Sequence, residues 1–241
     1  MTESFPLGPL FRRWSRRLAL SSDDKNAVAS LGWTRRQFQR DAYLAREGEP
    51  TNICTLLIEG VAYRQKILSD GSRQIISFHI AGEFLDLQNC LLEVADHNVQ
   101  ALTRCNVAAV PKELLLEVMN ARSAVGRAIW LDSLIDASVF REWVVNVGRR
   151  DAKQRIAHLL CELASRLKAA GLGEGPMFDF PLTQEHIGDA TGLTAVHTNR
   201  TLQALRRAGL ISLGASKLTV LDWDSLAQTG DFNERYLHHS V

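Results

Sequence analysis

A window near the carboxyl end of the chain combines several hydrogen-bond donors with an absence of acidic side chains. Between Ala190 and Leu221 there is no Asp or Glu, and the four cations give the window a formal charge of +4, although the whole chain carries only +1. Phosphates attract such a surface, and Arg, Asn and Gln can form paired hydrogen bonds with base edges in a major groove. The cations are Arg200, Arg206, Arg207 and Lys217. The chemistry indicated is non-covalent recognition of a nucleic acid.

Two short helices joined by a tight turn are expected to position these side chains. Thr183 can cap a helix over 184–190, Gly192 permits a turn with positive φ, and Thr194 can cap a second helix over 195–207. This arrangement is the helix-turn-helix unit, and a β-hairpin, or wing, is expected to follow over 211–221. The predicted inner face of the helix pair consists of Ile187, Ala190, Leu193, Leu202 and Leu205.

The outward positions divide into base-reading and phosphate-binding candidates. Arg200 can donate two hydrogen bonds to a guanine edge, and Asn199 or Gln203 can pair with adenine. Thr183, Gln184, Arg206 and Lys217 are better placed for backbone phosphates. The alternative is a solvated basic helix without a ligand. The predicted DNA-binding set is Thr183, Gln184, Val196, His197, Asn199, Arg200, Gln203, Arg206 and Lys217.

The preceding part of the chain has the pattern of an antiparallel β structure. Gly48, Gly60, Gly71 and Gly82 recur every 11 or 12 residues, and the runs between them are rich in aliphatic and aromatic residues. Short strands at this spacing favour a sandwich, roll or barrel, and Asp70-Gly71 is a hairpin signal. The predicted strands are 55–58, 61–68, 74–80 and 107–110.

After Pro111 the apolar residues follow a helical period. A long amphipathic helix is expected from Ala124, with a break at Gly148-Arg149-Arg150 and another helix from Asp151 to Leu167. The long helix carries more apolar residues than one packing face needs, so part of it should meet another element or a second copy of the chain. The alternative is a helix packed only on its own domain. The predicted segments are an arginine arm (1–20), a β domain (21–111), a helical region (112–147), a winged helix (148–223) and a tail (224–241).

Composition excludes several classes of protein. The 241 residues are 46% hydrophobic and 23% charged, which is ordinary for a folded chain and excludes disorder, collagen-like fibres and a uniformly basic nucleic-acid coat. There is no apolar run of about 18 residues and no signal peptide, so we expect a cytoplasmic protein without a membrane partner.

The four cysteines lack metal-site spacing and are expected to be reduced and buried. No nucleophile elbow, phosphate loop or carboxylate pair is present, so no enzymatic activity, catalytic residue or cofactor is predicted.

Several of these motifs resemble the cyclic-AMP receptor protein and fumarate-nitrate regulator (Crp/Fnr) superfamily of transcription regulators. The segments 182–189, 191–194, 199–202 and 205–211 are similar to its winged helix without a gap. The glycine ladder with Gly-Glu-Phe-Leu-Asp-Leu at 82–87 resembles its cyclic-nucleotide-binding roll, and the helix from Ala124 resembles its dimerisation helix. The resemblance implies an α+β fold with an N-terminal antiparallel β-roll sensor, a long dimerisation helix and a C-terminal winged helix-turn-helix.

The resemblance also implies a homodimer that binds a near-palindromic operator in double-stranded DNA. Val196, Asn199 and Arg200 would occupy the base-reading positions. Val196 replaces the acidic residue that many members carry there, so an operator sequence is not transferable. The arginine arm, expected to be solvated or to dock a partner, and the tail are candidate contacts for RNA polymerase.

The roll is predicted to bind an unidentified small-molecule effector. By resemblance the candidate effector-binding residues are Gly82, Glu83, Asp86 and Leu87. In nucleotide-binding members the following segment supplies an arginine that holds the cyclic phosphate, whereas here no Arg or Lys occurs between Arg73 and Arg104. A buried phosphodiester without a cation would lose a charge-assisted contact. We therefore predict that cyclic AMP is not the effector. The N-terminal cysteine cluster of the iron-sulfur members is also missing.

The histidines of the roll give an alternative interpretation of its function. His79, Glu83 and His97 could make it a metal-binding jelly-roll enzyme, or a metal or haem sensor. Their spacing disfavours this, since His79 and Glu83 are four apart across an expected turn and there is no His-x-His pair. No metal-binding residue is predicted, and His238-His239 are expected to be solvent-exposed.

Overall fold

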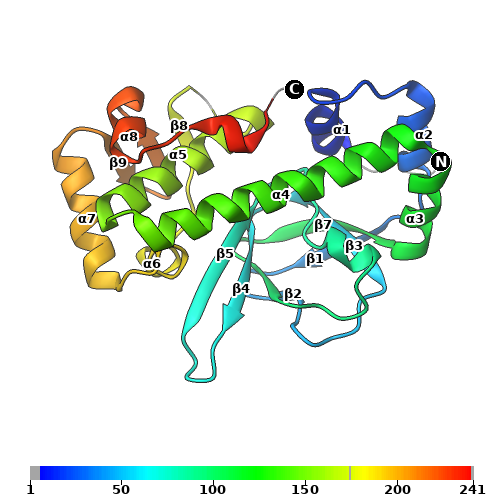
Figure 1. The fold of residues 1–241 in the computed structure, drawn as a ribbon, viewed down its shortest axis with the longest axis horizontal. Coiled ribbons are helices and arrows are strands. Elements are labelled where there is room, and N and C mark those ends of the chain that lie inside the picture. Colours follow the sequence, from blue (N-terminus) through cyan, green and yellow to red (C-terminus); the bar gives the residue numbers. More distant parts are fainter. Residues whose placement is uncertain (1–5, 174, 240–241) are drawn as a thin grey trace. The chain divides into compact units, whose positions relative to one another are not determined.

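The computed structural model describes residues 6–173 and 175–239 (Figure 1). Its contacts define two compact units, one formed by 6–66 with 77–137 and the other by 67–76 with 138–239. The first five residues of the predicted arm and the last two of the predicted tail lie outside the described residues. The bounds of the five predicted segments differ from those of these two units, and the division into five remains a prediction.

The first unit contains the antiparallel sheets expected from the glycine spacing. One sheet has the order β1-β7-β3 and the other β2-β6-β4-β5. The four predicted strands correspond to β3, β4, β5 and β7 and are confirmed, whereas β1, β2 and β6 were missed. Up to Arg149 the elements are α1 (Gly8–Ser15), α2 (Ser22–Ala29), β1 (Thr34–Phe38), β2 (Tyr43–Ala45), β3 (Ile53–Glu59), β4 (Ala62–Ile67), β5 (Arg73–His79), η1 (Leu87–Cys90), β6 (Asn98–Ala101), β7 (Cys105–Pro111), α3 (Lys112–Ala121) and α4 (Ser123–Arg149).

The expected solvated arginine arm is instead a packed helix. In α1, Leu10 and Trp14 are fully buried, and Trp14 stacks on Phe84 of the roll. Arg13 and Arg17 lie 3.2 and 3.3 Å from Asp132 of α4, so the prediction of a solvated face is wrong for these two residues. The apolar positions of α1 explain the difference, because a short helix with Leu and Trp on one side gains stability by burying that side.

The long helix α4 has two apolar faces. One face is buried and includes Val125, Ile129 and Ile135, while the other exposes large apolar side chains. The helix runs for 27 residues and ends at Arg149, so of the predicted break at Gly148-Arg149-Arg150 only Arg150 interrupts the helices, and the prediction is wrong for Gly148 and Arg149. The interruption lies at Arg150 and Asp151, where the Asp151 side chain caps α5 through the amides of Lys153 and Gln154. The exposed apolar residues of α4 are Trp130, Leu134, Phe140, Val144 and Val145.

The second unit contains the predicted helix pair and hairpin. Within it, β8-β10-β9 form a three-stranded antiparallel sheet, of which β8 was not predicted. With the roll and the long helix, these elements confirm the α+β class. From Asp151 onward the elements are α5 (Ala152–Ala170), β8 (Met177–Asp179), α6 (Gln184–Thr191), α7 (Ala195–Arg207), β9 (Ile211–Gly214), β10 (Lys217–Val220), α8 (Trp223–Thr229) and η2 (Glu234–Leu237).

The segment expected to be a tail packs on α5. The Tyr236 hydroxyl lies 3.0 Å from His158 Nε2 and donates to the buried Glu162 carboxylate at 2.9 Å. His239 is half-buried and bonds the Ser165 hydroxyl at 3.0 Å, so the expectation that both terminal histidines are exposed is wrong for His239. Glu162 is fully buried inside α5, and its carboxylate accepts from Trp143 of α4 and Arg166 of α5 as well as from Tyr236 near the end of the chain.

All four cysteines are free and buried, as predicted. Within 6–173 and 175–239, none of the helices is both long enough and apolar enough to cross a membrane.

Candidate nucleic-acid interface and effector site

The helix-turn-helix is held together by caps and by two glycines. The Thr183 hydroxyl accepts from the amide of His186, and the Thr194 hydroxyl accepts from the amide of His197, both at 3.3 Å. Gly192 has φ +66° in the turn, as predicted. Gly188 was not predicted to matter, yet a Cβ there would lie 2.6 Å from the backbone oxygen of Leu193. The turn therefore requires glycine at both positions, one for conformation and one for close approach.

The predicted inner and outer faces of the pair are separated as expected. Ile187, Ala190, Leu202 and Leu205 are buried, and Leu193 is half-buried. Thr198 and Thr201 of α7 are also buried, which was not foreseen. The predicted DNA-binding residues that are exposed are Thr183, Gln184, Val196, His197, Arg200, Gln203, Arg206 and Lys217.

Two of the predicted DNA-binding residues contact each other. The Asn199 side-chain amide donates to Gln184 Oε1 at 2.9 Å, and Asn199 is half-buried. This hydrogen bond joins α7 to the first turn of α6. The Gln184 oxygen thereby orients one amide proton of Asn199, which leaves its side-chain carbonyl and second proton for a partner.

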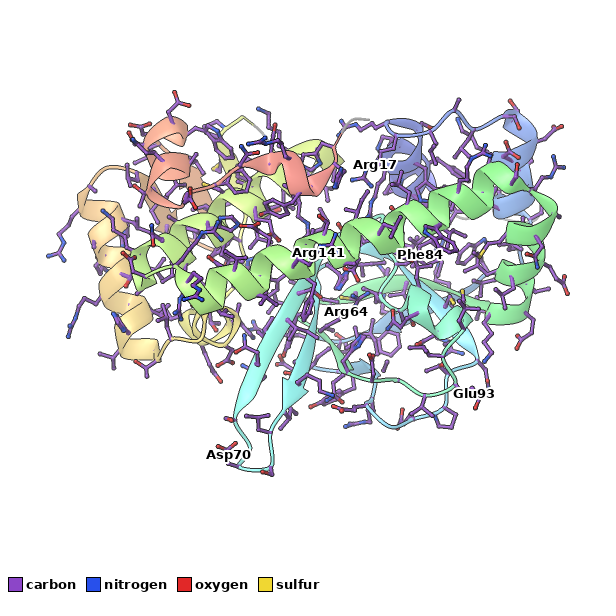
Figure 2. All side chains as sticks on the ribbon, in the orientation of Figure 1. Arg17, Arg64, Asp70, Phe84, Glu93 and Arg141 are labelled. Carbon is purple, nitrogen blue, oxygen red and sulfur yellow. The ribbon has the colours of Figure 1, made fainter. Side chains whose placement is uncertain are left out.

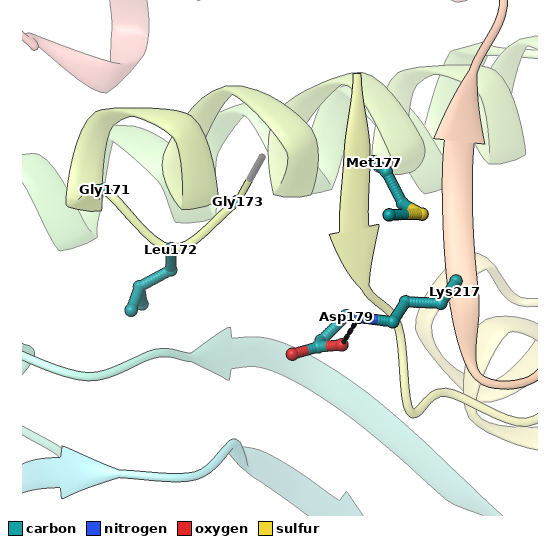
Figure 3. A pocket seen from close by; sticks show the side chains of 6 residues that line it. All are labelled: Gly171, Leu172, Gly173, Met177, Asp179 and Lys217. Carbon is teal, nitrogen blue, oxygen red and sulfur yellow. Dashed lines mark ion pairs between the residues drawn. The ribbon is translucent and has the colours of Figure 1, made fainter. Parts of the chain in front are cut away.

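The cations of α7 and of the wing differ in their partners. Within the part of the chain that the structure describes, Arg200, Arg206 and Arg207 form no ion pair, and all three are exposed. Lys217 in β10 instead lies 2.6 Å from the carboxylate of Asp179 in β8. Figure 3 shows this pair on the wall of a surface pocket that is also lined by Gly171, Leu172, Gly173 and Met177. The phosphate-binding prediction for Lys217 overlooked Asp179, which lies outside the acid-free window.

The wing is a hairpin with a left-handed two-residue turn. Ala215 and Ser216 have φ +48° and +56°, as the turns that fit the strand twist require. Leu218 is buried beneath the wing, while Lys217 is exposed beside the turn. The turn therefore presents polar backbone and Lys217 together, a suitable arrangement for phosphate contact.

The four candidate effector-binding residues are largely engaged inside the roll. Gly82 has φ +90°, and a Cβ there would lie 2.9 Å from the carbonyl carbon of Pro9. The Glu83 carboxylate is buried, 3.4 Å from His79 Nδ1 and 3.8 Å from Arg13. Asp86 is buried and accepts from the amide of Thr55 at 2.6 Å, and burial raises its pKa to about 6. Leu87, half-buried, begins η1.

The sequence around residues 82–87 contains no cation, but arginines from other elements lie next to these residues in the structure. Arg64 of β4 is buried, donates from Nε to the Leu85 oxygen at 2.9 Å, and pairs with Asp136 of α4 at 2.5 Å. Arg64 and Phe84 are labelled in Figure 2. Arg64 was not predicted as a site residue because nothing near it in the sequence marks it as internal. The weak signal available was the position of this arginine inside a predicted strand.

The residues of the metal-site alternative do not form one cluster. His79 bonds the Ser77 hydroxyl through Nε2 at 2.8 Å, and burial lowers its pKa to about 4. His97 pairs instead with Asp96, 2.6 Å away. Among the described residues, no three His, Cys, Asp or Glu side chains are grouped so that they could hold a metal ion. The structure offers no support for the alternative.

Comparisons with known proteins agree with this architecture. Residues 35–122 match the model of the cyclic nucleotide-binding domain, and residues 154–229 match that of the Crp-like helix-turn-helix domain. Among curated relatives, the nitrogen fixation regulation protein FixK of Bradyrhizobium diazoefficiens is 30% identical over 171 residues, covering 69% of each chain. The transcriptional activator protein FnrL of Cereibacter sphaeroides is 29% identical over 197 residues, covering 80% of this chain and 79% of that protein.

A solved structure extends the similarity to the whole fold. The structure of FixK2 from Bradyrhizobium japonicum matches with a TM-score of 0.76 at 25% identity, covering 83% of this chain and 98% of that one. Both the roll and the helix-turn-helix are thus those of one family of DNA-binding regulators. The chain belongs to the Crp/Fnr family of transcription regulators.

Proposed function

We propose that the chain is a cytoplasmic, homodimeric regulator, not an enzyme, that reads a near-palindromic operator with α7 and anchors itself through the wing. The observation that carries this proposal is the exposed outer face of α7, where Arg200 and Arg206 have no acidic partner among the described residues. Arg200, Asn199 and Val196 face base edges, while Thr183, Gln184, Arg206 and Lys217 contact phosphates. His197 and Gln203 complete the surface.

Dimer formation is supported by the second apolar face of α4. Trp130 and Leu134 are four residues apart, Phe140 and Val144 are four residues apart, and the offset of six residues between the two pairs keeps all four on one side of the helix; each is about half exposed or more. Such a stripe is the seam of a two-helix contact. Two copies joined there would carry two recognition helices for half-sites one helical turn, about 34 Å, apart.

The experiment that tests this function is selection of bound fragments from genomic DNA by the purified full chain. We expect an enriched motif with two-fold symmetry, and binding at least about 1,000-fold tighter than to scrambled DNA at the same salt concentration. Sedimentation of the same preparation should give a dimer, and Phe140→Asp should give a monomer with weakened operator binding. Equal affinity for selected and scrambled DNA would overturn the proposal.

The effector of the roll is proposed to be a small molecule other than cyclic AMP. No cation occurs between Arg73 and Arg104, and Arg64 and Arg13 are occupied by Asp136, Asp132 and Glu83. A cyclic phosphate would have to displace one of these carboxylates. Calorimetry should therefore show no binding at micromolar cyclic AMP, and a micromolar Kd would refute this part.

We also propose that the arginine arm contacts RNA polymerase. Relatives of this chain bear the names of transcriptional activators, and Arg12 and Arg16 of the arm are exposed. Changing both to Ala should lower transcription from a promoter with the selected operator while leaving operator affinity unchanged. Unchanged transcription would contradict a role for this segment.

A further inference from the structure

Two of the four cysteines are in contact with each other inside the roll. Cys54 of β3 and Cys90 of η1 are 36 residues apart in the sequence, and their Sγ atoms are 3.2 Å apart. A disulfide bond is about 2.05 Å long, so the two sulfurs need to approach by little more than 1 Å. We propose that Cys54 and Cys90 form a reversible disulfide when the protein meets a hydroperoxide, and that this modification alters operator binding.

The two thiols are not equivalent. Both are buried, but Cys54 is completely enclosed, whereas Cys90 is 6% exposed, ends a four-residue 3-10 turn and is followed by exposed Leu91 and Leu92. The hydrogen bond with Cys54 lowers the pKa of Cys90, and the same bond raises the pKa of Cys54. Cys90 is therefore the sulfur that an oxidant reaches first. Its lowered pKa also favours the thiolate, which is the form of cysteine that attacks a peroxide.

Access to Cys90 depends on a loop held by few interactions. Residues 92–95, which include Glu93 in Figure 2, are tied to 48–51 by four hydrogen bonds: Thr51 donates to the oxygens of Leu92 and Glu93, Ala95 donates to the oxygen of Glu49, and Gly48 donates to the oxygen of Ala95. The side chains of Leu91 to Val94 are exposed and add little packing. Local opening of this loop costs less than unfolding the roll and admits a small oxidant.

The reaction balances with hydrogen peroxide as the only co-reactant. The Cys90 thiolate attacks one peroxide oxygen, the O–O bond breaks, and the protein gains a sulfenic acid while hydroxide takes up the proton that Cys90 lost. The Cys54 sulfur then attacks the Cys90 sulfur, the S–O bond breaks, and the hydroxyl leaves with the Cys54 proton as water. Two thiols have lost two electrons in total, and peroxide has become two molecules of water. A dithiol reverses the change.

The cysteine pair shares a hydrophobic core with α4, the helix proposed to form the dimer. Cys54 and Cys90 belong to the core cluster that also contains Val125, Ala128 and Ile129 of α4. Close-packed interiors transmit a shift of one side chain to its neighbours. Movement of η1 toward β3 would therefore change the packing of α4 next to Trp130, on its exposed apolar face. This step rests on the proposed function, whereas disulfide formation does not.

Tryptic peptides separate all four cysteines, so the test is direct. Cleavage after Arg and Lys places Cys54 in 47–64, Cys90 in 74–104, Cys105 in 105–112 and Cys161 in 156–166. The native chain is treated with a small excess of hydrogen peroxide, the remaining thiols are alkylated under denaturing conditions, and the digest is analysed by mass spectrometry. We expect free thiols to fall from four to two and peptide 47–64 to be linked to 74–104.

Matched variants identify the order of events. Cys54→Ala should leave a sulfenic acid on Cys90 that dimedone traps, whereas Cys90→Ala should protect Cys54. Cys105→Ala should behave like the native chain, because burial raises the pKa of Cys105 to about 11 and its sulfur donates to the backbone oxygens of Val61 and Thr103 instead of to another sulfur. The oxidised native chain should also melt about 5 to 10 °C higher.

Disulfide formation and its effect on operator binding are tested separately. Four intact thiols, or linkages spread over Cys105 and Cys161, would overturn the disulfide whatever the variants do. A disulfide that leaves operator affinity within threefold of the reduced value, before and after dithiothreitol, would overturn the regulatory half. Loss of operator preference in the reduced chain as well would point instead to failure of the proposed function.

Discussion

The outer face of α7 and the interior of the roll both carry arginines, but the arginines have opposite surroundings. Arg200 and Arg206 are exposed and form no ion pair within the described residues, whereas Arg64 and Arg17 are largely buried against Asp136 and Asp132. An exposed, unpaired guanidinium keeps its hydrogen bonds for a partner, and a buried one uses them to stabilise the fold. The comparison shows that charge alone does not mark a binding site.

The largest effect should come from removing the carboxylate that three groups of the arm share. Asp132 accepts from Trp14 at 2.8 Å and pairs with Arg13 and Arg17. Asp132→Ala removes the carboxylate nearest to two partly buried cations and takes the acceptor from the buried Trp14 Nε1–H, so we expect a loss of about 3 to 5 kcal/mol in the free energy of unfolding. Urea denaturation measures it. The control is Glu47→Ala, which breaks the exposed pair with Lys66 and should cost less than about 1 kcal/mol. Equal losses of unfolding free energy in the two variants would contradict the distinction between buried and exposed charges.

The next effect should appear in DNA binding without a change in stability. Arg200→Ala should weaken operator binding by about 1 to 3 kcal/mol, or roughly 5- to 150-fold, and relax the preference at one base pair. Titrations with the selected operator and with single-base variants measure both quantities. Arg36→Ala removes the same charge from exposed β1 and serves as the control. An equal loss in both variants would mean that Arg200 contributes only overall charge.

Two buried groups of the roll should make opposite contributions to the pH dependence of stability. Burial lowers the pKa of His79 to about 4, so the unfolded chain binds more protons between about pH 4 and 6.5, and this contribution to stability is lost as the pH falls through that range. Burial raises the pKa of Asp86 to about 6, so the folded chain binds more protons between about pH 4 and 6, and stability rises on acidification.

Variants at these positions should separate the two contributions. Asp86→Asn should steepen the loss of stability between pH 6.5 and 4.5, and His79→Gln should flatten it, each by at most about 1.4 kcal/mol per pH unit. Urea titrations at pH 4.5, 5.5 and 6.5 measure the slopes. Parallel curves for both variants and the unchanged chain would show that these groups do not titrate on unfolding as described.

The smallest effect should be at the wing. Lys217 is paired with Asp179 in the free chain, so a phosphate contact replaces an existing ion pair, and Lys217→Ala should cost less than about 1 kcal/mol for operator and scrambled DNA alike. The slope of log K against log salt should become shallower by about 1. Asp179→Asn should strengthen binding slightly by releasing Lys217. A sequence-dependent loss in Lys217→Ala would instead assign Lys217 to base reading.

Local patterns in the sequence determined the elements that carry their own signals. Thr183, Gly192 and Thr194 predicted the bounds of α6 and α7 closely, because caps and a left-handed turn depend on the residues at those positions. The glycine spacing likewise predicted β3, β4, β5 and β7. The strand β1 was missed because Thr34–Phe38 is mostly exposed and polar, so it has no alternation to detect.

The tertiary structure alone decided which charges remain available and which sulfurs meet. Arg13, Arg64 and Asp132 come from three elements far apart in the sequence, and no local pattern distinguishes them from surface charges. Cys54 and Cys90 are in contact because β3 and η1 pack together in one core. The physical reason is that caps and turns depend on neighbours along the chain, whereas burial and pairing depend on neighbours in space.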